Sequence, residues 1–304
     1  MIGDVPEGDT VFLAGRRLHD ALAGRVLLRG ELRHPRLVEH DLTGRTVLEV
    51  VSVGKHLFTR FDDATSLHSH FRMDGSWHLY RPGRPWRGAD HDIRAVLGVE
   101  DRYAVGFRLH DLDLLPTARE DTWVGHLGPD LLGPGWEADP AGSEAEMVRR
   151  LRAAPERELG AALLDQRVAA GVGNLYKAEV CFLMGVSPWT RVGDLTDAQV
   201  LDTVRWSRRL LERNAWRPEQ STTGDLGDGA QHWVFERGGR GCRRCRDAVR
   251  TAGQADTPRA DGGSPDHEDR IAYFCPTCQP GPHPALPRRG GRRPQQQTSR
   301  RARY

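Results

Sequence analysis

The residues with the clearest chemical use stand near the beginning of the chain. Pro6 and Glu7 are adjacent, and they would place a secondary amine beside a carboxyl group if Pro6 were the first residue of the mature protein. An α-amino group has a reference pKa near 8, against about 10.4 for a lysine side chain, so a terminal amine keeps a nucleophilic fraction at neutral pH. A neighbouring carboxyl can accept and return protons. The pair therefore predicts covalent chemistry through an amine.

The residues before Pro6 bear directly on this prediction. With Met1 to Val5 attached, the nitrogen of Pro6 is an unreactive tertiary amide. GTG codes for valine inside a gene and also serves bacteria as a start codon, so we expect translation to begin at Val5 and the initiator to be removed. The alternative is that Pro6 and Glu7 simply open a helix, since proline and acidic residues both suit a first helical turn.

Four of the five cysteines form two CxxC pairs, Cys242 with Cys245 and Cys275 with Cys278. Two such pairs are the spacing of a tetrahedral four-cysteine zinc site, and four thiolates leave no open position, which predicts one structural Zn²⁺. Residues 255–269 between the pairs are expected to be a disordered insertion. Arginines near the cysteines either contact phosphates or form an ordinary arginine-rich surface. Cys181 is expected to be a core residue.

A turn between two predicted helices offers a second kind of site. One helix is expected to end near Gln166, and Gly171 and Gly173 then lead to Asn174 at the start of the next. Backbone N–H groups at a helix start, beside an amide side chain, can bind a phosphate.

The composition limits the location and the kinds of partner that can be expected for this protein. The chain has 304 residues and a net charge of only +2, and just two of its 44 basic residues are lysines, Lys55 and Lys177. Lys177 is predicted to be a solvated helix charge. No stretch approaches the roughly 18 apolar residues of a membrane span, and no signal peptide is evident, so we expect a cytoplasmic protein. Cysteines in metal-type pairs fit a reducing compartment.

The pattern of the chain predicts a multidomain α+β protein. A helix at 9–24, with Asp9 or Thr10 as its N-cap, precedes short strands typical of an antiparallel β-sandwich, at 45–53, 56–61, 65–70, 76–80, 93–99 and 103–109. Helices are expected at 143–153, 156–166, 173–184 and 196–214. The predicted divisions are an N-terminal β-sandwich domain at 5–115, a linker at 116–140, a helical domain at 141–223, a zinc-finger domain at 224–280 and a disordered basic tail at 281–304.

Taken together, the motifs resemble those of the formamidopyrimidine-DNA glycosylase/endonuclease VIII family, over roughly residues 5–279. The landmarks follow that family's order: Pro6-Glu7-Gly8, Gly54-Lys55-His56-Leu57, His70 to Trp77, Leu163 to Val180 and Arg270 to Gln279. The segment 163–180 is similar to the family's helix-two-turn-helix signature. The opening Pro-Glu-Gly-Asp-Thr looks most like actinobacterial endonuclease VIII-type members.

The resemblance implies a bifunctional DNA glycosylase/AP lyase of base excision repair. It implies Pro6 as the Schiff-base nucleophile, Glu7 as general acid/base and Lys55 as a proton donor and phosphate contact, with cleavage by β- or β,δ-elimination. It also implies DNA contacts by Met73, Arg108, Asn174 and Arg270. The phenylalanine that follows the arginine in the family's 8-oxoguanine branch is absent after Arg108. We therefore expect oxidised pyrimidines and abasic sites as substrates, in duplex or single-stranded DNA, and a monomeric enzyme.

Two other functions remain open on the sequence. If Pro6 is blocked, the chain is expected to be a non-catalytic homologue that binds damaged DNA. A zinc-ribbon protein that binds RNA or the ribosome would account for the cysteines, but not for Pro6, Glu7 and Lys55 together.

Overall fold

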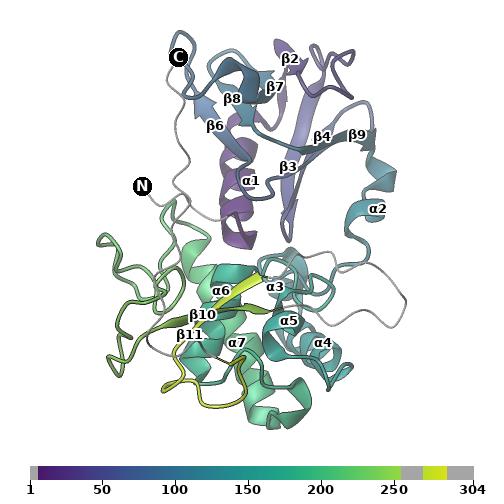
Figure 1. Cartoon of the computed structure of the whole chain (residues 1–304). Helices are drawn as coiled ribbons and strands as arrows, with labels where there is room; N and C mark the ends of the chain where they lie inside the picture. The colour runs from purple at the N-terminus through teal and green to yellow at the C-terminus, as the bar shows by residue number, and fades with distance from the viewer. Residues whose placement is uncertain (1–5, 255–269, 286–304) are drawn as a thin grey trace.

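The computed structural model describes residues 6–254 and 270–285. Two lobes follow one another along the chain (Figure 1). The first contains helix α1 and two antiparallel sheets, and the second contains helices α3 to α7 and a two-stranded hairpin. This is the α+β architecture that the sequence predicts. Val5, the predicted insertion at 255–269 and most of the predicted tail lie outside the described residues.

Helix α1 (Gly8–Leu22) begins one residue earlier than its apolar pattern suggested. The predicted N-cap, Asp9 or Thr10, is wrong, because both lie inside the helix and Glu7 holds the capping position. The backbone N–H of Glu7 donates to Thr10 Oγ1 at 3.4 Å. Val11, Leu18 and Leu22 are buried against the sheets. The helix therefore fixes the position of Glu7 relative to the sandwich.

Two antiparallel sheets form the first lobe. The five-stranded sheet has the order β1 (Arg25–Val26), β3 (Thr46–Val53), β4 (His56–Phe61), β5 (Thr65–His70) and β9 (Asp111–Pro116). The four-stranded sheet has the order β2 (Arg29–Leu32), β7 (Ile93–Gly98), β8 (Tyr103–Phe107) and β6 (Ser76–Tyr80). The six predicted strands are confirmed within two residues, whereas β1, β2 and β9 were not predicted.

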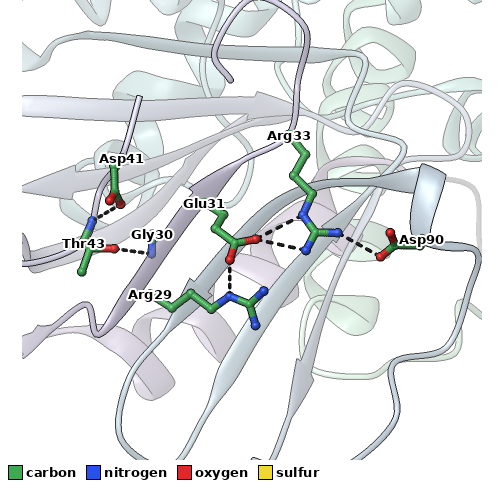
Figure 2. Close-up of polar contacts among 7 residues, drawn as sticks. All are labelled: Arg29, Gly30, Glu31, Arg33, Asp41, Thr43 and Asp90. Carbon is green, nitrogen blue, oxygen red and sulfur yellow. Dashed lines mark hydrogen bonds and ion pairs between the residues drawn. The ribbon is translucent and has the colours of Figure 1, made fainter. Parts of the chain in front are cut away.

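Strand β2 is held at the edge of its sheet by side-chain contacts (Figure 2). Arg33 donates to Glu31 Oε2 at 3.0 Å and to Asp90 Oδ1 at 2.9 Å, which links the strand to the turn before β7. Thr43 Oγ1 accepts from the backbone N–H of Gly30 at 3.1 Å. These contacts are exposed or half-buried, so their main effect is to set register rather than to add much stability.

The second lobe has its own core. Its longer helices are α4 (Pro140–Arg152), α5 (Leu159–Leu164), α6 (Asn174–Met184) and α7 (Asp197–Asn214). The segment predicted as a linker contains two short helices, α2 (Asp121–Val124) and α3 (Pro134–Ala138), and Trp136 of α3 is buried in the core of this lobe. Trp136 and the fully buried Leu131 thus anchor a stretch whose glycine and proline content indicated a connection.

The last described element is the antiparallel hairpin of β10 (Arg250–Gln254) and β11 (Arg270–Phe274), which packs on α6. Cys242 and Cys275 belong to the same buried cluster as the helices. Among the described residues, none of the helices combines the length and the hydropathy that crossing a bilayer needs.

Candidate active site

The carboxyl group of Glu7 lies at the beginning of α6. Its Oε2 accepts from the backbone N–H of Gly173 at 2.8 Å, and its Oε1 accepts from that of Leu175 at 2.7 Å. Glu7 is 1% exposed. The first N–H groups of a helix have no partner within the helix, so a carboxylate that binds them is stabilised by both hydrogen bonds and the helix dipole. The two lobes are thereby joined through one side chain.

Glycines allow this close approach. A Cβ at Gly173 would lie 2.5 Å from Glu7 Cδ and 2.5 Å from Lys55 Nζ. A Cβ at Gly8 would lie 2.7 Å from Gly171 Cα, and the N–H of Gly8 donates to the carbonyl of Gly171 at 2.9 Å. A residue with a Cβ would not fit at Gly173 or Gly8 unless its neighbours moved. The absence of a side chain at Gly173 therefore allows Glu7 and Lys55 to lie against the start of α6.

Lys55 lies in the turn between β3 and β4, directly after Gly54, which has a φ of +58°. The N–H of Gly54 donates to Asp130 Oδ2 at 2.9 Å, which fixes the turn against the second lobe. Burial lowers the pKa of Lys55 from its ordinary value, and the Glu7 carboxylate opposes that effect. Burial raises the pKa of Glu7 to about 7, opposed chiefly by Lys55. A carboxyl that titrates near neutral pH suits general acid/base catalysis.

A second buried carboxyl supports Glu7. Asp9 Oδ2 accepts from the hydroxyl of Tyr176 at 2.6 Å and from Gln220 Nε2 at 3.0 Å. Burial raises the pKa of Asp9, and the charge of Asp9 in turn helps to raise the pKa of Glu7. These residues were not predicted as part of the site. Asp9 looked like a helix cap, and nothing in the sequence joins it to Gln220, 211 positions later.

The predicted DNA-binding residues Asn174, Arg270 and Met73 lie near one another. Asn174 is the first residue of α6, and its Nδ2 donates to the carbonyl of Ile271 on β11 at 3.1 Å. Arg270 begins β11, and its Nη1 lies 3.8 Å from the sulfur of Met73. Met73 is 64% exposed, between β5 and β6 of the first lobe. The three residues therefore meet where the lobes face each other.

Arg108 directly follows β8, has a φ of +48°, and makes its ion pairs with residues other than Asn174, Arg270 and Met73. Its Nε is 3.3 Å from Asp74 Oδ2 and its Nη1 is 3.2 Å from Asp92 Oδ2. Asp74 follows Met73 in the chain, so Arg108 borders the loop that carries the exposed methionine.

Pro6 is partly exposed and directly precedes Glu7. Its ring nitrogen is thus one residue from the buried carboxyl. The residues before it lie outside the described ranges, so the predicted start at Val5 remains a prediction.

Lys177 lies in a different environment from the one predicted. It was predicted to be solvated, but it is 0% exposed on α6, one turn after Asn174. The prediction was wrong because β11, almost a hundred residues later in the chain, covers this part of α6. Cys181, on the same helix, is buried in the core as predicted, and burial raises the pKa of its thiol to about 12.

The four paired cysteines converge. All four Sγ atoms lie within 4.8 Å of one another, with Cys242 and Cys278 at 3.8 Å and Cys245 and Cys275 at 3.5 Å. A tetrahedral zinc with Zn–S bonds of about 2.3 Å separates its sulfurs by about 3.8 Å. The donor set therefore fits a four-coordinate metal ion.

Two family models match the chain. The N-terminal domain of formamidopyrimidine-DNA glycosylase matches residues 5–111, and the H2TH domain of the same family matches residues 132–224. Together they span the sandwich, the Gly-rich turn and the helices around Glu7.

Curated relatives cover nearly the whole chain. A probable endonuclease 8 2 of Streptomyces coelicolor is 51% identical, covering 95% of this chain and 98% of its own. The DNA-(apurinic or apyrimidinic site) lyase Nei2 of Mycolicibacterium smegmatis is 42% identical over 90% of this chain and 99% of its own.

Solved structures share the fold. Lactococcus lactis formamidopyrimidine-DNA glycosylase, in complex with DNA that contains an oxidised pyrimidine, superposes with a TM-score of 0.73 at 22% identity. That comparison covers 91% of this chain and 100% of the other. The same protein with DNA containing N7-benzyl-Fapy-dG gives a TM-score of 0.72 at 21% identity, over 91% and 100% of the two chains.

Proposed function

This chain belongs to the formamidopyrimidine-DNA glycosylase/endonuclease VIII family, and from that premise we propose that it is a bifunctional DNA glycosylase and abasic-site lyase of base excision repair. The observation that carries the proposal is the buried carboxyl of Glu7, bound to the first N–H groups of α6 beside Lys55 and directly after Pro6. The names of the actinobacterial relatives, endonuclease 8 and abasic-site lyase, support it.

The proposed reaction begins at Pro6. Its free secondary amine attacks C1′ of the damaged nucleotide, the base leaves with the electrons of the glycosidic bond, and the nitrogen loses its proton. Opening of the sugar ring gives an iminium, an electron sink that permits β-elimination on the 3′ side and then δ-elimination. Glu7 protonates the ring oxygen and then transfers protons. Its pKa near 7 makes both of its forms accessible at neutral pH.

DNA binding in this proposal uses both lobes. Lys55, Asn174 and Arg270 contact phosphates next to the lesion, and Lys55 also assists proton transfer. Met73 is exposed and unbranched, which suits insertion into the space that a flipped nucleotide leaves. Arg108 borders the same loop and contacts the opposite strand or its backbone. The enzyme acts as a monomer on chromosomal DNA in the cytoplasm.

We propose oxidised pyrimidines and abasic sites as the substrates, in preference to 8-oxoguanine. The residue after Arg108 is Leu109, which is fully buried, so the loop has no aromatic side chain after its arginine to insert beside the opposite base. The endonuclease 8 names of the curated relatives favour the same branch.

The four cysteines are proposed to hold one structural Zn²⁺. A bound zinc would supply cross-linking and no chemistry, because four thiolates fill its coordination shell. Cys275 and Cys278 directly follow β11, so the cluster would fix the strand that presents Arg270 to DNA.

A second function, damaged-DNA binding without catalysis, follows if Pro6 carries additional residues. Incubation with abasic-site DNA and borohydride separates the two. An enzyme with a free Pro6 amine forms a covalent complex that survives denaturation, whereas a binding protein retains DNA only under native conditions.

A further inference from the structure

Lys177 has no role in the proposed reaction, and its setting is unusual. It is fully buried on α6, three residues after Asn174, and its Nζ has no hydrogen-bond partner among the described residues. Lys177 and Lys55 are also the only lysines among 44 basic residues, and both have Glu7 as an electrostatic neighbour. The chain therefore concentrates its compact ammonium groups at one place.

The charges around Lys177 do not neutralise it. Burial, assisted by the guanidinium of Arg270, lowers the pKa of its amine to about 8, and Cys181 and Glu7 act in the opposite direction. The Cys181 thiol is neutral at physiological pH. The oxygens of Glu7 already accept from the N–H groups of Gly173 and Leu175. An unpaired buried ammonium is costly, so this site is arranged for an anion that comes from outside the chain.

Asn174 shows the same incomplete pairing. Its Oδ1 is buried without a hydrogen-bond partner among the described residues, and its Nδ2 is bound to the carbonyl of Ile271. One N–H of this amide is thus engaged by β11. The amide has two N–H groups, so the second can donate to a phosphate while the first stays on Ile271. Since β11 covers the part of α6 that carries Lys177, a phosphate on Asn174 reaches the Lys177 amine only when β11 shifts.

We propose that Lys177 is a further phosphate-binding residue, which joins Asn174 and Arg270 on a backbone phosphate of the damaged strand when a shift of β11 uncovers its amine. The inference rests on the proposed function, because the anion it requires is that of DNA. Its chemistry is a direct ammonium–phosphate contact. An arginine would carry the same charge, but the enclosed space beside Cys181 and Arg270 suits a smaller group.

The test measures binding to duplex DNA that contains tetrahydrofuran, an abasic-site analogue that cannot form an imine. The variant Lys177→Met keeps the length of the side chain and removes its charge. We expect the slope of log K against log salt to become shallower by about one, the effect of losing one phosphate contact. Arg149→Met is the matched control, since Arg149 is exposed on α4 and paired with Glu146, and its slope should equal that of the wild type.

Thermal melting separates this role from a structural one. A buried amine without a partner contributes no stability, so Lys177→Met should melt at or above the wild-type temperature. Lys177→Gln, neutral but still polar, should give the same shallow slope. A wild-type slope in both variants, or a shallow slope accompanied by a lowered melting temperature in both, would overturn the inference.

Borohydride trapping tests the proposed lyase function separately from the salt slope, which tests the role of Lys177. Absence of a borohydride-trapped complex in the wild type contradicts the lyase but leaves the difference in salt slope intact. An unchanged slope with normal trapping rejects only the role of Lys177.

Discussion

Glu7 and Gly173 are 166 positions apart in the chain, yet the N–H of Gly173 donates to the carboxylate of Glu7 at 2.8 Å. This bond joins the cap of α1 to the cap of α6, and so connects the sandwich to the helical lobe at the place where Lys55 also arrives. The arrangement accounts for a carboxyl that is both enclosed and held in one orientation.

Gly173→Ala should impair catalysis strongly. Its Cβ would lie 2.5 Å from both Glu7 Cδ and Lys55 Nζ, so one or both groups must shift. Misplacement of a catalytic group by about 1 Å can cost about a hundredfold in rate, and we expect a loss of that order in single-turnover strand cleavage of abasic-site DNA. Gly135→Ala is the control, because a Cβ there meets no atom within 4 Å. Equal rates for the two variants would contradict the close packing described around Glu7.

Glu7 should make folding stability depend on pH in a defined direction. Its pKa is about 7 in the folded protein, against 4.5 for an ordinary glutamate, so the folded state binds more protons between these values. Stability therefore falls as the pH rises from about 4.5 to 7, by about 3 kcal/mol for this group alone.

Urea unfolding of the wild type and Glu7→Gln across that pH range checks this prediction. The wild type should lose stability relative to the variant as the pH rises, because glutamine has no proton to lose. Parallel curves, or a wild type that gains stability relative to the variant, would be inconsistent with a protonated buried Glu7.

The cysteine cluster should bind one zinc ion per chain. We expect metal analysis of the purified protein to give about one equivalent, and Cys275→Ser, which replaces a buried ligand, to reduce it sharply. DNA affinity should fall in parallel, since Arg270 lies on the strand that precedes Cys275. Cys181→Ser is the control because Cys181 lies outside the cluster. A full equivalent of zinc in Cys275→Ser would reject the proposed ligand set.

Local patterns predicted much of the fold. Alternating strands and helical periodicity predicted six strands and five helices, and two CxxC pairs predicted the cysteine cluster. Of the strands missed in the first lobe, β1 has two residues and β2 has four, and β9 ends in a proline at the edge of its sheet. Their pairing depends on neighbours that are distant in the sequence, which periodicity does not report.

The residues of the site likewise fall into those that the local sequence identifies and those that only the packing identifies. Glu7, Lys55 and Asn174 stood out because each is a reactive or polar residue next to glycine or a predicted turn. Asp9 and Lys177 did not stand out, since a helix cap and a solvated lysine have the same local pattern as a buried acid and a buried amine. Only the packing of Gln220 on Asp9, and of β11 on α6, distinguishes these possibilities.

The most direct test of the proposed reaction identifies the atom that attacks DNA. The protein is incubated with abasic-site DNA and borohydride, digested, and the peptide attached to the DNA is sequenced by mass spectrometry. We expect a reduced adduct on the nitrogen of Pro6, in a peptide that begins with Pro6 and Glu7. A peptide in which Pro6 follows Val5, an adduct on Lys55 or Lys177, or no adduct at all would contradict it.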